Sequence, residues 1–73
     1  MPRFELLRQA MERQGMTYTD LALRTGLAMP HVRRVVLGQH PHVSAQVLAR
    51  LCQALGVRLT DVLADELHER KTG

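Results

Sequence analysis

The chain has 73 residues with one phenylalanine and one tyrosine, which predicts a single small domain with an aliphatic core. Its lone cysteine, Cys52, excludes an intramolecular disulfide framework and favours a reducing compartment. Charged side chains interrupt the N-terminus before any apolar signal-peptide core can form, and no apolar run approaches the ~18 residues of a membrane span. We therefore expect a cytoplasmic protein with no membrane partner.

The net charge of +3 is unevenly distributed along the chain. Residues 21–58 contain five arginines and no acidic residue. Residues 1–20 carry three basic and three acidic side chains, and residues 59–73 carry two basic and four acidic ones. A localised basic surface is typical of proteins that bind polyanions. Charge alone is equally compatible with an ordinary solvated surface.

A first helix is predicted over about residues 3–14, where apolar side chains recur at three- and four-residue spacing. These side chains are Phe4, Leu7, Ala10 and Met11. Gly15 ends this helix as a left-handed cap. Thr17 then begins a second helix as its N-cap, because its side-chain oxygen can accept a backbone N–H of the first turn.

A third helix is predicted between Ala28 and Gly38, with Pro30 in its first turn, where a missing N–H costs little. The second and third helices are therefore short and are joined by a tight turn at Gly26, the pattern of a helix-turn-helix. Residues 39–43 follow as a loop.

Two further helices complete the predicted all-α fold. Ser44 caps a fourth helix that ends at Gly56. The fifth helix covers about residues 60–67 with Thr60 as its N-cap, and the polar residues 68–73 follow it. No segment has the alternating pattern of a strand.

Residues 15–38, GMTYTDLALRTGLAMPHVRRVVLG, resemble the helix-turn-helix of the Cro/phage-repressor family, also called lambda repressor-like or XRE-type. Residues 44–57 resemble the fourth helix of that family, and the resemblance covers about residues 7–64. It implies a compact, all-α, five-helix lambda-repressor-like domain that occupies residues 1–73 as a single unit.

The resemblance also implies a function, namely sequence-specific binding of double-stranded DNA by a homodimeric transcriptional regulator, a repressor, of a prokaryotic cell or phage. The third helix would enter the major groove. Its base-reading residues would be Met29, Pro30, His31, Arg33 and Arg34. Phosphate contacts would come from Thr17, Tyr18, Gln39, His40 and His42. Arg34 could donate a bidentate pair to guanine, whereas Met29 and Pro30 could only contact a thymine methyl group.

Three positions depart from the family pattern. Ala28 stands where the family has a serine N-cap, a loss of about 1 kcal/mol. Met11 and Val36 replace an arginine and a glutamate that often form a buried ion pair in the family. Losing one partner would strand a buried charge, but replacing both can be neutral or stabilising. We therefore expect Met11 and Val36 to touch.

The C-terminal part has more apolar residues than one small core needs, so we expect a dimer interface there. The candidates are Val57, Leu59, Val62, Leu63 and Leu67. A two-fold dimer would read half-sites about 34 Å apart.

A protein-interaction module is the alternative function, either an antitoxin or a phage-encoded adaptor. It is favoured by the apolar side chains Met29, Pro30, Val36 and Leu37 in and directly after the third helix. DNA binding weakens steeply with salt because counterions are released, whereas an apolar protein contact is much less salt-sensitive.

Metal and catalytic sites are not expected. His31, His40 and His42 have no obvious further ligand for a metal ion, and Cys52 is expected in the core as a small apolar residue. The sequence contains no Ser-His-Asp or Cys-His arrangement and no glycine-rich phosphate loop. We expect no enzymatic activity, no cofactor and no small-molecule substrate.

Overall fold

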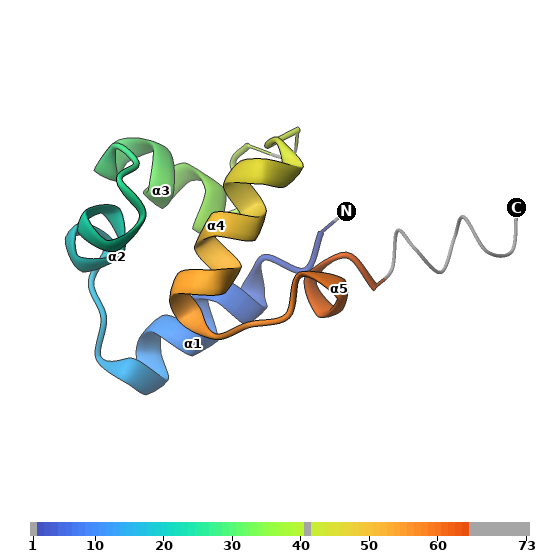
Figure 1. Cartoon of the computed structure of the whole chain (residues 1–73), viewed down its shortest axis with the longest axis horizontal. Helices are drawn as coiled ribbons and strands as arrows, with labels where there is room; N and C mark the ends of the chain where they lie inside the picture. Colours follow the sequence, from blue (N-terminus) through green and yellow to red (C-terminus); the bar gives the residue numbers. More distant parts are fainter. Residues whose placement is uncertain (1, 41, 65–73) are drawn as a thin grey trace, which may run out of the picture.

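Five α-helices form within residues 2–40 and 42–64, the residues that the computed structural model describes (Figure 1). In chain order they are α1 (Glu5–Gln14), α2 (Tyr18–Thr25), α3 (Met29–Val36), α4 (Ala45–Leu55) and α5 (Leu59–Val62). This part of the chain contains no strand. The predicted all-α, five-helix fold is confirmed.

The ends of α1, α2 and α4 are stabilised by the residues that the sequence indicated. Thr17 and Asp20 form a reciprocal capping box, in which the Thr17 hydroxyl accepts the Asp20 N–H at 3.1 Å and the Asp20 carboxylate accepts the Thr17 N–H at 3.0 Å. The Ser44 hydroxyl accepts a backbone N–H of the first turn of α4 at 3.2 Å. Gly15 and Gly56 end α1 and α4 as predicted.

The start of α5 differs from the prediction. Arg58, not Thr60, occupies the N-cap position, and its side chain forms no capping hydrogen bond. The carbonyl of Arg58 already accepts the N–H of Asp61 at 3.1 Å, so the helix is under way before Thr60 and its hydroxyl cannot cap it. The predicted end of this helix at residue 67 and the polar tail of residues 68–73 lie outside the described residues.

A single core joins all five helices. α4 contacts α1, α2 and α5, while α3 contacts α2 and α1. The buried hydrophobic residues are Phe4, Leu7, Ala10, Met11, Leu21, Ala22, Val32, Val35, Val36, Leu48, Leu51, Cys52, Leu55 and Val62. Phe4 is the one aromatic among them, so the core is aliphatic as predicted. Met11 and Val36 both belong to this cluster.

The helix-turn-helix occupies one end of the molecule. α2 and α3 lie side by side there, and α5 lies toward the opposite end (Figure 1). Within the described residues, no helix combines the length and apolar composition that a membrane span requires.

Candidate nucleic-acid interface

α3 has one buried and one exposed side. Val32, Val35 and Val36 are 0%, 0% and 1% exposed, so they anchor the helix in the core. Arg33 and Arg34 are exposed on the opposite side. This division follows from the three- and four-residue spacing of the valines, and it leaves the two guanidinium groups outside the fold.

The start of α3 is apolar and has few free hydrogen-bond donors. Ala28 occupies the N-cap position and its side chain forms no capping bond. Pro30 has no N–H, and the N–H groups of His31 and Val32 both donate to the Ala28 carbonyl at 3.0 Å. The exposed tip therefore presents Ala28, Met29 and Pro30, whose side chains can contact apolar groups such as a thymine methyl but offer no hydrogen-bond donor to a phosphate.

The predicted apolar surface of α3 is smaller than the sequence suggested. Met29 and Leu37 are 40% and 37% exposed, but Val36 is buried. Val36 lies in the core cluster that contains Met11, so of the apolar residues that favoured a protein-interaction module, this one is not available to a partner.

The loop after α3 returns past the start of the helix. Gly38 has φ +75°, a conformation that favours glycine, and a Cβ added to it would lie 3.6 Å from Cδ2 of the Phe4 ring. This turn brings the ring centroid of His40 within 5.6 Å of that of His31, in an edge-to-face arrangement. The structure thus brings together two histidines from the predicted base-reading and phosphate-contacting groups.

The remaining phosphate candidates have unequal surroundings. Gln39 and His42 are exposed, and Tyr18 is half-buried against the core cluster. The Thr17 N–H is already bonded to Asp20. Hydrogen bonds from Thr17, first its N–H and then its hydroxyl, lower the pKa of Asp20, and the charge of Arg24 lowers it further. Asp20 is therefore ionised at neutral pH, and its charge opposes a phosphate at Thr17.

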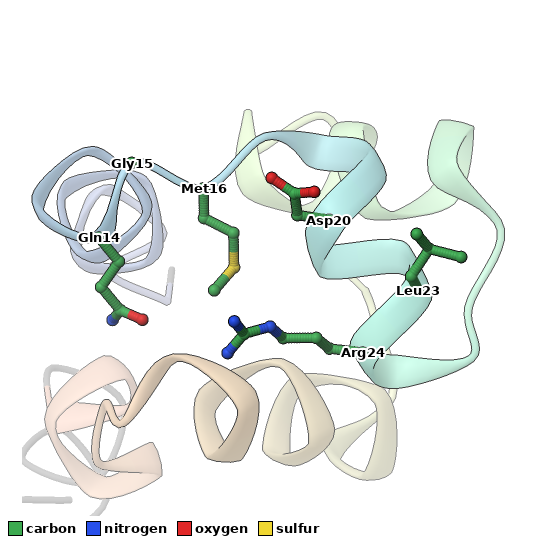
Figure 2. A pocket seen from close by; sticks show the side chains of 6 residues that line it. All are labelled: Gln14, Gly15, Met16, Asp20, Leu23 and Arg24. Atoms are coloured by element: carbon green, nitrogen blue, oxygen red, sulfur yellow. The ribbon is translucent and has the colours of Figure 1, made fainter.

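A hollow lies between α2 and the end of α1. It is lined by Gln14, Gly15, Met16, Asp20, Leu23 and Arg24. Figure 2 shows the Arg24 side chain reaching from α2 toward the end of α1, with Met16 beside it and Leu23 pointing outward. Leu23 is 79% exposed, and sequence reasoning did not single it out. The helical pattern of α2 could have revealed it, because Leu23 lies off the Leu21–Ala22 face.

The predicted dimer residues are divided between core and surface. Val57, Leu59 and Leu63 are half-buried and pack against the core. Val62 is 0% exposed. It fills this chain's own core, so the prediction that it faces a partner was wrong. Leu67 lies outside the described residues.

Cys52 is 2% exposed in α4, and burial raises the pKa of its thiol. The sequence-based assignment of Cys52 to the core is confirmed. Among the described residues, no three histidine, cysteine, aspartate or glutamate side chains are grouped as metal ligands.

Comparison with known proteins gives one result. Residues 6–67 match the family model of the Cro/C1-type HTH DNA-binding domain. No curated protein and no solved structure gives a significant match. The family match covers α2–α5 and all of α1 except Glu5, and it includes the turn at Gly26 and the exposed arginines of α3. The chain therefore belongs to the Cro/C1-type helix-turn-helix DNA-binding family.

Proposed function

We propose that this protein is a sequence-specific regulator of transcription that binds double-stranded DNA with α3 in the major groove. The observation that carries the proposal is the division of α3 into a buried valine side and an exposed side with Arg33 and Arg34. Because residues 21–58 contain no acidic residue, no carboxylate of this stretch competes with DNA for the two guanidinium groups.

Each part of the exposed surface has a proposed role. Arg34 donates a bidentate pair to guanine O6 and N7, the commonest specific contact in the major groove. Met29 and Pro30 contact the methyl group of a thymine. Gln39 and His42 contact phosphates, which fix the register of α3 but carry no sequence information.

The proposed assembly is a two-fold homodimer that represses transcription by occupying promoter DNA. One small domain reads few base pairs, and a dimer doubles the site, with half-sites about 34 Å apart. Val57, Leu59 and Leu63 supply the proposed contact, since they lie around α5 and retain exposed surface. Sedimentation of wild type and Leu63→Asp over a concentration series tests this interface. The proposal predicts that the variant is monomeric at protein concentrations at which wild type is still a dimer.

Fluorescence anisotropy tests the proposed DNA binding. The full-length protein is first used to select duplexes from a random library, and affinity is then measured for a selected duplex and a scrambled duplex of equal composition. The proposal expects tight binding to the selected duplex alone, with log affinity falling linearly with log salt concentration. Failure to enrich any duplex at low salt would refute it.

A protein-interaction module remains the second candidate because Met29 and Leu37 are substantially exposed on and beside α3. Such a module would bind a protein partner through apolar contacts, with little dependence on salt. Absence of DNA selection, together with a salt-insensitive complex that Met29→Asp abolishes, would favour this function.

A further inference from the structure

Thr25 organises the turn between α2 and α3. It is 7% exposed and is the one buried polar residue in the described part of the chain. Its hydroxyl donates to the Leu21 carbonyl at 2.8 Å and accepts the Leu27 N–H at 3.4 Å. The same side chain thus joins the last turn of α2 to the segment that leads into α3.

The backbone carbonyl of Thr25 receives a bond from a distant helix. This carbonyl lies at the C-terminal end of α2, where the last carbonyl groups have no partner within the helix. The Arg50 guanidinium of α4 donates to it, with an Nη1–O distance of 3.4 Å. A cation at a helix C-terminus also interacts favourably with the helix dipole.

This bond is unusual within the molecule. Within the described part of the chain, only two side-chain hydrogen bonds join residues that are more than twenty positions apart in the sequence. One joins Gln14 to the Leu55 carbonyl, and the other joins Arg50 to Thr25. The bond from Gln14 joins α1 to the end of α4, whereas the bond from Arg50 joins α4 to the turn that leads into α3.

We propose that Arg50 is a positioning residue for DNA recognition, which holds the α2–α3 turn and thereby sets the direction of α3. The proposal rests on the DNA-binding function proposed above. A bidentate arginine contact tolerates errors of only about 0.5 Å and 10–20° in its support. α3 has eight residues and is joined to α2 through Gly26, Leu27 and Ala28, so a loosened turn displaces its tip.

Two duplexes distinguish positioning from direct contact. Arg50→Ala is expected to weaken binding to the selected duplex by about fivefold, the size of one modest hydrogen bond, and to leave the scrambled duplex nearly unaffected. The slope of log affinity against log salt stays at its wild-type value, because no phosphate contact is lost. Arg50→Lys, which keeps a donor and the charge, recovers most of the affinity.

Arg58→Ala is the matched control. It removes the same charge from the same acid-free stretch, and no side-chain hydrogen bond of Arg58 occurs among the described residues. This control is expected to weaken both duplexes slightly and to the same extent. Thermal melts followed by circular dichroism identify a temperature at which every variant is folded, and the affinities are measured at that temperature.

The proposal is overturned if Arg50→Ala weakens both duplexes equally and lowers the salt slope by about one, since Arg50 would then contact a phosphate itself. It is also overturned if binding does not change at all. Amide NMR spectra provide a readout without DNA: Arg50→Ala should shift the Gly26 and Leu27 signals, and Arg50→Lys should restore them. If no duplex is ever selected, the proposed function fails, while these spectra still test whether Arg50 holds the α2–α3 turn.

Discussion

At the scale of single residues, burial determines the chemistry of Cys52. Its side chain packs in the core cluster, and removal from water disfavours the thiolate, which raises the thiol pKa. The thiolate is the nucleophilic form, so the folded protein both shields this sulfur and keeps it protonated. The role of Cys52 is therefore to fill space in the core as a small apolar side chain.

Alkylation kinetics test this account of Cys52. Because the reagent gains access only when the core opens, which costs several kcal/mol, iodoacetamide should react with the native protein at least about 100-fold more slowly than with the protein unfolded in urea. Mass spectrometry of quenched samples gives both rates. Equal rates would show that the sulfur is accessible in the folded state.

Arg33 and Arg34 illustrate a residue-scale property that the sequence predicted well. The valine spacing alone places both arginines opposite the core. Arg50 illustrates the reverse case. Its bond to the Thr25 carbonyl joins residues 25 positions apart, and no local pattern distinguishes it from any other exposed arginine.

At the scale of elements, the capping box of α2 links stability to pH. Hydrogen bonds from Thr17 lower the pKa of Asp20 in the folded protein, so the ionised carboxylate stabilises the fold. This contribution is fully present above the unfolded carboxyl pKa of about 4 and is lost as pH falls through the lower, folded value.

Asp20→Asn removes this ionisation and therefore tests it. The urea midpoint of wild type should exceed that of the variant at pH 6, and the difference should shrink as pH falls below about 4. Urea titrations followed by circular dichroism at several pH values measure the difference. A gap that stays constant down to pH 2.5 would show that the carboxylate charge is not responsible.

α1 and α3 are held together by an apolar contact region. Met11 and Val36 are 5% and 1% exposed within one core cluster, and their helices contact each other. The expectation that these two side chains touch is compatible with this arrangement. It stays a prediction about the pair.

A double-mutant cycle tests the pair. Val36→Glu buries a charge without a partner and should destabilise the fold by about 3–5 kcal/mol. Adding Met11→Arg should recover much of that loss by supplying the partner. Urea unfolding of the four proteins gives the coupling. If the two losses simply add, the side chains do not interact.

The helix boundaries show which elements a sequence can predict. Thr17, Ser44, Gly15 and Gly56 act locally, through bonds that span a few residues, so their patterns were sufficient. Thr60 was misassigned because a threonine near the start of a helix does not by itself fix the N-cap position. The hydrogen bonds to the Arg58 carbonyl decide the start of α5.

At the scale of the whole molecule, the burial of α5 could not be predicted from the sequence. The apolar residues near the C-terminus serve either the core or a partner, and composition does not separate the two uses. The structure places Val62 wholly inside and leaves Leu63 half-buried. The answer depends on how α4 and α5 pack together, which is a long-range property.

The distribution of charge agrees with the architecture over the part of the chain that the structure describes. The acid-free stretch of residues 21–58 includes α3, α4 and the loop between them, while the acidic residue Asp61 lies on α5 toward the opposite end. A DNA-binding surface at α3 would therefore present Arg33 and Arg34 to the phosphates and keep Asp61 away from them.

Dimethyl sulfate footprinting of the selected duplex tests the central claim, that α3 reads bases in the major groove, most directly. This reagent methylates guanine N7, which lies in the major groove, and adenine N3, which lies in the minor groove. The account predicts that wild type protects guanine N7 within each half-site, and that Arg34→Ala, at saturating concentration, loses protection at one guanine per half-site. Protection of adenine N3 alone, or a guanine pattern unchanged by Arg34→Ala, would contradict it.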